Sequence, residues 1–183
     1  MRKFILAFLA GLLCLHVSAQ VKTIDGDNMP ATKSIYDNLA TAKNFTVLLN
    51  AIQKAGLSTQ FTGTTPVTIL APNNKAFAAL PAGTIDTLLK PEHKIELARL
   101  INNHILAGKI TSADIARQIK MNNGQAVFTT LAGSKLTAKI DANRNIALTD
   151  ENGSQSVVSR FDVQQLNGVL HTVTALLIPS PAL

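Results

Sequence analysis

Cysteine is almost absent from this chain, since Cys14 is the only one among 183 residues. It lies within an apolar run, Phe4–Val17, which follows the basic pair Arg2-Lys3 and precedes the small residues Ser18-Ala19. A basic start, an apolar stretch and small residues before the cut are the parts of a secretory signal peptide, which we expect at residues 1–19. Cleavage there would remove Cys14, so the mature chain is predicted to have no disulfide and no thiol chemistry.

Clustered charge and tryptophan are also lacking. The chain has no Trp, its aromatic content is 4%, and its lysines are scattered singly. Its formal net charge of +6 falls to +4 once Arg2 and Lys3 leave with the signal peptide. A nucleic-acid groove needs clustered cations beside stacking aromatic rings, so we expect no nucleic-acid partner. Weak attraction to an acidic polysaccharide or an anionic surface remains open.

No long apolar run follows the signal peptide, so the mature chain is predicted to have no stable transmembrane segment. Its 164 residues suit one domain with a sizeable core. The polar residues 20–33 are expected to form a flexible lead-in, and residues 34–180 a single domain. An exported chain of this kind is predicted to be periplasmic, attached to the cell surface or extracellular.

Helical periodicity dominates the first half of the domain. Phe45, Leu48, Leu49 and Ile52 follow the i, i+3, i+4, i+7 spacing of one buried helix face, and Gly56 is placed to end that helix. Further helices are expected at 35–39, 73–80 with Asn73 as its N-cap, 84–89, 91–108 opened by Pro91 and closed by Gly108, and 111–120 with a capping box from Thr111 to Asp114. A short strand, Val67–Leu70, lies between them.

Alternation replaces that periodicity in the second half. Polar and apolar residues alternate over 135–140, which is typical of a half-buried strand. Further strands are expected at 146–149, 157–161 and 169–178. Helices in one half of the chain and strands in the other indicate the α+β class.

Three segments in order resemble the fasciclin domain family. Residues 68–77 read TILAPNNKAF, residues 100–109 read LINNHILAGK, and residues 167–179 read NGVLHTVTALLIP. They are similar to the family's T-x-[FL]-A-P segment, its central H-[IV]-[LV]-x-G-K segment and its closing N-G-V-[IL]-H segment. The positions that carry this resemblance, taken as family-motif residues with structural or interaction roles, are Thr68, Pro72, Asn73, Phe77, Asn103, His104, Asn167, Gly168 and His171.

This resemblance implies a fasciclin-like β-wedge packed with several α-helices, found in exported or cell-surface proteins. It also implies adhesion to a surface protein, a matrix component or a polysaccharide, with no cofactor. Asn103 stands where many members have Tyr before the His, and Thr174 stands where Asp is frequent. An adhesive role of a Tyr-His pair therefore does not carry over to this chain.

Two histidines are candidates for a structural or a functional role. His104 shares an apolar helix face in the expected helix, and His171 lies in the last expected strand. A buried imidazole needs partners for its ring nitrogens, so we interpret both as hydrogen-bonded core residues; a ligand-binding or pH-sensing role is the alternative. His93 and His104 are eleven residues apart on one expected helix, or about 16 Å, too far to share a metal ion.

The remaining candidate sites are weak. Residues 141–145 resemble the start of a calcium loop, but Ile146 replaces the required Gly and Asn152 replaces the bidentate Glu, so a hairpin turn is expected. Ser134 and Ser154 fall in expected turns and no Gly-x-Ser-x-Gly elbow occurs. We therefore predict no metal site, no cofactor and no enzymatic activity.

Two functions remain. The first is an exported, non-catalytic adhesion or interaction module, which the signal peptide and the three segments favour. The alternative is a carrier or scavenger of a small apolar ligand, which the hydrophobic content of 46% with few aromatic residues favours.

Overall fold

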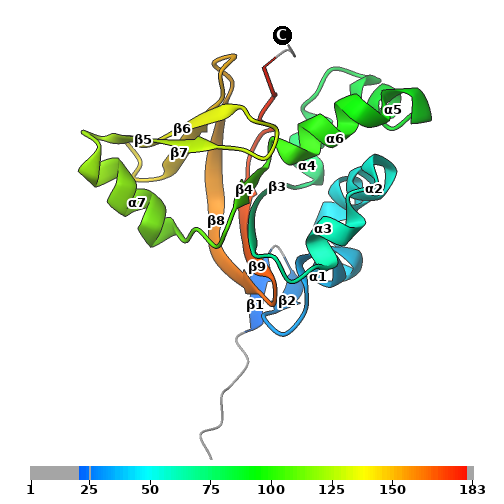
Figure 1. Cartoon of the computed structure of the whole chain (residues 1–183), viewed down its shortest axis with the longest axis horizontal. Coiled ribbons are helices and arrows are strands. Elements are labelled where there is room, and N and C mark those ends of the chain that lie inside the picture. The colour runs from blue at the N-terminus through cyan, green and yellow to red at the C-terminus, as the bar shows by residue number, and fades with distance from the viewer. Residues whose placement is uncertain (1–20, 25, 181–183) are drawn as a thin grey trace, which may run out of the picture.

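The structure is a computed structural model of the chain, and it describes residues 21–24 and 26–180 (Figure 1). The predicted signal peptide lies outside these residues. Helices α1 to α6 gather on one side of the long central strands, while α7 and strands β5 to β7 lie on the other side. Within the described ranges, no helix is both long enough and apolar enough to cross a bilayer.

Most helices form where the periodicity predicts them. The face of α2 carries the fully buried Leu48 and Ile52, and Gly56 ends the helix with a φ of 76°. The helices are α1 (Ile35–Thr41), α2 (Thr46–Ala55), α3 (Ser58–Thr62), α4 (Asn74–Ala78), α5 (Thr84–Leu88), α6 (Lys94–Asn102) and α7 (Ser112–Met121), with 3-10 turns η1 (Lys43–Phe45) and η2 (Pro91–His93).

A sheet in the order β4-β3-β9-β8-β7-β6-β5 forms the second layer. Strands β3 and β9 pair in parallel and every other pair in this sheet is antiparallel. An isolated bridge between Leu106 and Thr130 brings the two ends of the sheet together. The α+β prediction is confirmed. The strands of this sheet are β3 (Val67–Pro72), β4 (Ile105–Ala107), β5 (Gln125–Thr129), β6 (Lys135–Ile140), β7 (Ile146–Thr149), β8 (Gln155–Gln165) and β9 (Gly168–Val173).

The central pair β3 and β9 separates two hydrophobic clusters. Because side chains alternate along a strand, Ile69 and Leu170 pack with the helices α1 to α6. Leu70 and Val173 pack instead with α7 and the inner faces of β5 to β8. One pair of strands therefore supplies a wall to both halves of the core.

The expected helix 91–108 is wrong over residues 103–108. Helix α6 ends at Asn102, and residues 105–107 form strand β4. The backbone N–H of Leu70 donates to the carbonyl of His104 at 2.8 Å, and that of Leu131 donates to Ile105 at 2.9 Å. These distant pairings outweigh the local helical pattern. The strand expected at 169–178 is also too long, since β9 ends at Val173.

The expected flexible lead-in over 20–33 is also corrected. Residues 21–24 form strand β1 (Val21–Ile24) and residues 27–30 form strand β2 (Asp27–Pro30), which pair as an antiparallel hairpin. The side chains of Ile24 and Met29 have no exposed surface and belong to the helical half of the core. Burial of these apolar side chains and the hydrogen bonds of Asp27 stabilise the hairpin, although the composition of this segment is typical of a loop.

Asp27 connects this hairpin to the helical layer. Its carboxylate accepts from the backbone N–H of Lys43 at 2.9 Å and from the backbone and side-chain amides of Asn44 at 3.0 and 3.1 Å. Burial opposes ionisation of this group, but the donors from Lys43 and Asn44 outweigh it and lower the pKa of Asp27 below its ordinary value. No local side chain caps η1, so Asp27 supplies a cap from a distant segment.

Replacing Asp27 by Ala should lower the free energy of unfolding by about 1–3 kcal/mol, because three amide donors lose their acceptor. Urea unfolding at neutral pH measures this loss. The matched control is Asn28→Ala in the same strand, since the Asn28 side chain is exposed and, among the described residues, accepts a hydrogen bond from the Thr23 hydroxyl alone. Equal losses in the two variants would contradict the anchoring role.

Candidate interaction surface

His104 is sealed inside the fold. Its Nδ1 lies 2.9 Å from the carbonyl oxygen of Leu100, and its Nε2 accepts from the backbone N–H of Leu177 at 3.0 Å. The Leu177 donor requires an unprotonated Nε2, so Nδ1 carries the proton and donates to Leu100. Burial, against the weaker opposing effects of Leu100 and Asp150, lowers the pKa of His104 from 6.5 to about 4. The prediction of a hydrogen-bonded core histidine is confirmed.

Asn103, the neighbour of His104, also bonds to the backbone of Leu177. Its side-chain amide donates to the Leu177 carbonyl at 3.0 Å, and its carbonyl accepts from the Thr130 hydroxyl at 3.1 Å. The residue has no exposed surface. Adjacent residues thus hold both backbone groups of Leu177, which fixes the segment that follows β9.

His171 is the second internal histidine, and its proton lies on the other nitrogen. Nδ1 accepts from the backbone N–H of Asp162 at 3.2 Å, so Nε2 donates to the Ile110 carbonyl at 2.9 Å. Burial, opposed by the Ile110 bond and the charge of Asp162, lowers the pKa of His171 below its ordinary value. Here too the prediction of a hydrogen-bonded core residue is confirmed.

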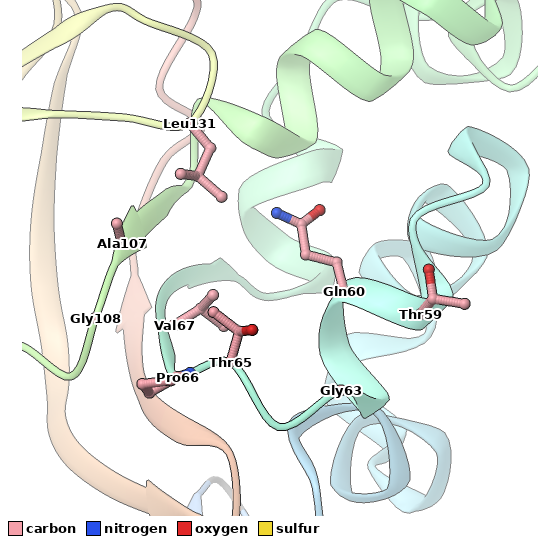
Figure 2. Close-up of a pocket in the computed structure, with 9 residues that line it drawn as sticks. All are labelled: Thr59, Gln60, Gly63, Thr65, Pro66, Val67, Ala107, Gly108 and Leu131. Atoms are coloured by element: carbon pink, nitrogen blue, oxygen red, sulfur yellow. The ribbon is translucent and has the colours of Figure 1, made fainter.

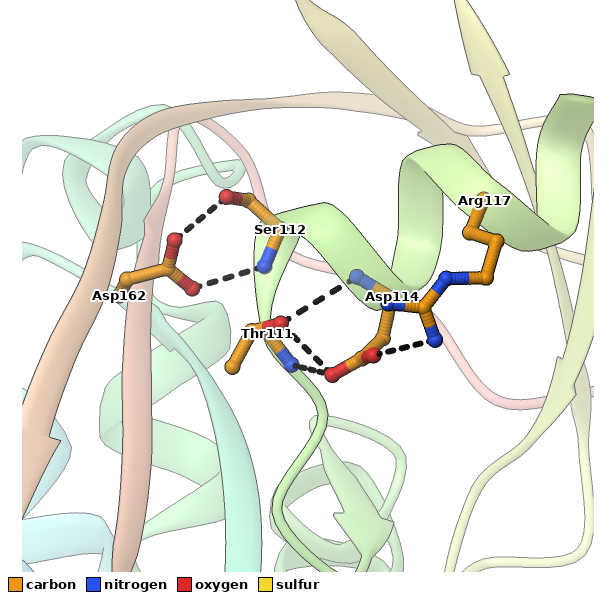
Figure 3. A network of polar contacts seen from close by, with 5 residues as sticks. All are labelled: Thr111, Ser112, Asp114, Arg117 and Asp162. Atoms are coloured by element: carbon orange, nitrogen blue, oxygen red, sulfur yellow. Dashed lines mark hydrogen bonds and ion pairs between the residues drawn. The ribbon is translucent and has the colours of Figure 1, made fainter.

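Asp162 lies at a bulge of β8, and its backbone N–H donates to His171. Its side chain faces the start of α7 (Figure 3). The Asp162 carboxylate accepts from the backbone N–H of Ser112 at 2.7 Å and from its hydroxyl. Thr111 and Asp114 form the predicted capping box, and Arg117 lies 3.2 Å from Asp114. The N-terminus of α7 is therefore occupied by two carboxylates of the chain itself.

Asn167 and Gly168 connect the helices to the central strands. The Asn167 side chain accepts from Ile35 N–H at 2.9 Å and donates to the carbonyls of Phe61 and Gly63 at 2.7 and 3.1 Å. A Cβ placed on Gly168 would lie 1.9 Å from the carbonyl oxygen of Val67. Only glycine permits this approach of β9 to β3.

The remaining motif residues also form hydrogen bonds or pack inside the fold. The Thr68 hydroxyl donates to the Gly108 carbonyl and accepts from Ile110 N–H, both at 2.8 Å. Pro72 ends β3, and Asn73 caps α4 by accepting from Ala76 N–H at 3.0 Å. Phe77 is 3% exposed in the helical half of the core. The family-motif residues are thus spread over β3, α4, the end of α6 and the start and middle of β9, and they do not converge on one open site.

A groove beside the central strands is the surface feature that the motifs do not identify. It measures about 270 Å³ and lies between α3 with the following loop on one side and β4 with Leu131 on the other. Figure 2 shows Gln60 and Leu131 extending toward the space between them. Leu131 is 42% exposed. Its lining residues are Thr59, Gln60, Gly63, Thr65, Pro66, Val67, Ala107, Gly108 and Leu131.

This groove has the chemistry of a contact surface. None of its lining side chains is titratable, so it offers no acid, base or charged ligand, while hydroxyl and amide groups flank an apolar floor. Sequence reasoning missed it because its walls come from three segments separated in the sequence, residues 59–67, residues 107–108 and Leu131, and exposed Leu131 gives no periodic signal.

The positions that the sequence analysis considered for calcium binding or nucleophilic catalysis lie in or beside turns. Asp141 accepts from the N–H groups of Asn143 and Asn145 at 2.9 and 2.8 Å, which closes the β6–β7 hairpin as predicted. Ser134 and Ser154 also lie at or beside hairpin turns. Over residues 21–24 and 26–180, no group of three His, Cys, Asp or Glu side chains is placed to hold a metal ion.

The comparison with known families agrees with the three segments. A family model described as Fasciclin domain matches residues 43–179. The chain belongs to the Fasciclin domain family. The fasciclin match begins after the β1–β2 hairpin, which nevertheless packs into the same core.

Fasciclin relatives occur in bacteria and animals. Protein sll1483 of Synechocystis sp. is 33% identical over 146 residues, which cover 80% of this chain and 73% of that protein. Transforming growth factor-beta-induced protein ig-h3 of Sus scrofa is 31% identical over 163 residues, which cover 88% of this chain but 22% of the relative. This chain therefore spans about a fifth of that larger protein.

A solved structure has the same fold. The FAS1 domain pair from the insect cell adhesion molecule Fasciclin I superposes with a TM-score of 0.68 at 15% sequence identity, over 80% of this chain and 51% of that chain. The fasciclin-like wedge packed with helices is thus confirmed.

Acid should destabilise the protein through His104. The unfolded chain binds a proton near pH 6.5, whereas the native His104 binds one only near pH 4, so stability falls as pH drops through this window, by about 3 kcal/mol in total. Urea unfolding at pH 7 and pH 4.5 measures the loss. His104→Gln should be less stable at pH 7 but lose less on acidification, whereas His93→Gln, at a half-buried surface position outside the core, should show the acid loss of the wild type. Identical acid losses in all three would contradict this.

Gly168→Ala should prevent stable folding or remove more than about 4 kcal/mol, because a methyl group meets the Val67 carbonyl at 1.9 Å. Gly153→Ala is the matched control. Its φ is also positive, at 83°, but nothing lies within 4 Å of the added Cβ, so it should cost about 1–2 kcal/mol. Thermal unfolding of both variants compares them, and similar stabilities would contradict the close approach.

Proposed function

We propose that this chain is an exported, non-catalytic interaction module that binds a surface protein, a matrix component or a polysaccharide. The observation that carries the proposal is the internal use of the motif side chains. His104, His171 and Asn167 make all their described bonds to backbone groups inside the fold. Recognition is therefore assigned to the outer surface.

The family supports this proposal at a coarse level. Fasciclin I, whose domain pair shares this fold, is a cell adhesion molecule. This chain covers about half of that structure and a smaller share of ig-h3, so only the general role of an adhesive domain is transferred. Export follows from the predicted signal peptide, and it places the domain in the periplasm, at the cell surface or outside the cell.

The groove between α3 and Leu131 is the contact site that we assign. An apolar floor edged by Gln60, Thr59 and Thr65 suits one or two side chains or a sugar ring, since neutral hydrogen-bonding groups surround apolar surface. The formal charge of +4 that remains without Arg2 and Lys3 lies outside the groove and would assist association with acidic partners over longer range.

A carrier role has weaker support. An apolar hollow of about 250 Å³ lies between α5, α6 and residues 178–179, lined among others by Leu88 and Leu100. Pockets that bury a small ligand usually measure about 300–1,000 Å³. The hollow is smaller than that range, and we therefore favour recognition of a macromolecule.

Binding to immobilised glycans and purified matrix proteins tests the proposal. Leu131→Asp should weaken any specific binding at least tenfold, because a carboxylate replaces apolar contact surface at the rim of the groove. Ile95→Asp is the control, since Ile95 is 84% exposed on α6 and does not line the groove. Folded wild-type protein that binds nothing on the panel, or an equal loss in both variants, would overturn the assignment.

A further inference from the structure

A second hollow lies between the start of α7, the β6–β7 turn and β8. It measures about 260 Å³, and the residues that line it are different from those of the groove beside Leu131. Ile140 on its wall is 44% exposed, so apolar surface is open to solvent here. The lining residues include Ser112, Ala113, Ala116, Ile140, Arg144 and Phe161.

Arg144 supplies the charge of this hollow. The residue is exposed, and within the part of the chain that the structure describes no hydrogen bond or ion pair engages its guanidinium group. Its φ of 65° is a left-handed conformation that Gly and Asn adopt more readily than Arg. The arginine therefore occupies an unfavourable backbone position without stabilising the fold through its side chain.

The carboxylates on the three surrounding elements are already engaged. Asp114 of α7 pairs with Arg117 at 3.2 Å (Figure 3). Both carboxylate oxygens of Asp162 on β8 accept from Ser112. Asp141 accepts hydrogen bonds from the amides of its own turn. The charge that lacks a partner at this hollow is therefore positive.

Lys120 extends the charged surface along α7. Ala113, Ala116 and Lys120 follow the i, i+3, i+7 spacing of one helix face, and both alanines line the hollow. Lys120 lies about 6 Å beyond Ala116 along the helix axis, and helical side chains lean toward the N-terminus, which here is toward the hollow. Lys120 is exposed, and the ion pairs of the described residues do not include it.

An apolar wall beside two unpaired cations matches the chemistry of an acidic sugar chain. One uronic acid ring carries both an apolar C–H face and a carboxylate. The ring would lie against Ile140 and Phe161, while the guanidinium of Arg144 would take the carboxylate through two parallel hydrogen bonds. Pockets that bury a whole small ligand usually measure at least about 300 Å³. The hollow is smaller, so it suits one ring of a longer chain.

We propose that this hollow binds a uronate residue of an acidic polysaccharide. Arg144 pairs with its carboxylate, and Lys120 pairs with the carboxylate of a neighbouring sugar. Charge complementarity decides the partner, since a neutral glycan would leave both cations unpaired. The Ser112 hydroxyl donates to Asp162 and keeps its lone pairs for a sugar hydroxyl. This site goes beyond the groove of the proposed function, because it is a separate surface with a defined ligand chemistry.

Calorimetric titration with a hexamer of galacturonic acid tests the proposal. We expect a dissociation constant of about 0.1–1 mM. The methyl-esterified hexamer should bind at least tenfold more weakly, because it keeps the sugar rings but has no carboxylates. A hexamer of glutamic acid should also bind more weakly, because it has the charges without the rings. No binding of the galacturonate hexamer, or equal affinity for either control, overturns the proposal.

The variant Arg144→Asn separates binding from folding. Because Asn adopts positive φ more readily, the midpoint of thermal unfolding should rise by about 2–4 °C. Affinity for the galacturonate hexamer should nevertheless fall about three- to tenfold. Arg144→Lys, which keeps the charge but not the forked geometry, should bind with intermediate affinity. Lys54→Gln removes one charge from exposed α2 and should change affinity less than twofold. Equal losses in Arg144→Asn and Lys54→Gln would mean attraction to net charge alone and would overturn the site.

NMR titration of the wild-type protein locates the contact without a variant. The methyl signals of Ala113, Ala116 and Ile140 should shift as the galacturonate hexamer is added, while those of Leu131 should not. Shifts confined to Leu131 would overturn this site and support the groove as the place of glycan binding. Failure of this proposal is thereby distinguished from failure of the proposed function.

Discussion

The parallel pairing of β3 with β9 is the constraint on which the rest of the molecule depends. These strands are separated by about one hundred residues, and they approach so closely that Gly168 has no room for a side chain beside Val67. Side chains on one face of the pair pack with six helices, and those on the other face pack with α7 and four strands. Any displacement of this pair would open both halves of the core.

Polar groups at the ends of this pair keep it in register. His104 and Asn103 hold the chain after β9, Asn167 holds the chain before it, and His171 holds its middle against Ile110. The two imidazoles have their protons on opposite nitrogens, and each accepting nitrogen faces a backbone N–H. Since protonation would place two hydrogens face to face, the fold requires both rings to be neutral.

The hydrogen bonds of these buried polar side chains limit which groups can take part in recognition. A histidine whose two nitrogens are both bonded to backbone has no free position for a substrate, and Asp162 is likewise committed to α7. Charged side chains on the surface remain available for recognition, as do the hydroxyl, amide and apolar groups of the groove beside Leu131.

The sequence by itself determined the α+β class, the caps of α4 and α7, the end of α2 at Gly56, the alternating strand β6 and the burial of His104 and His171. Each of these features depends on residues within one or two helical turns of each other, or on one of the three fasciclin-like segments of the sequence. Only the tertiary structure decided that residues 21–24 and 27–30 pair and dock on the core, that α6 ends at Asn102, and that residues 105–107 pair with β3. The groove also belongs to this second group. The physical reason is that a strand pairing or a distant cap such as Asp27 is stabilised by groups many residues away, whereas a local pattern records only the period and the ends of an element.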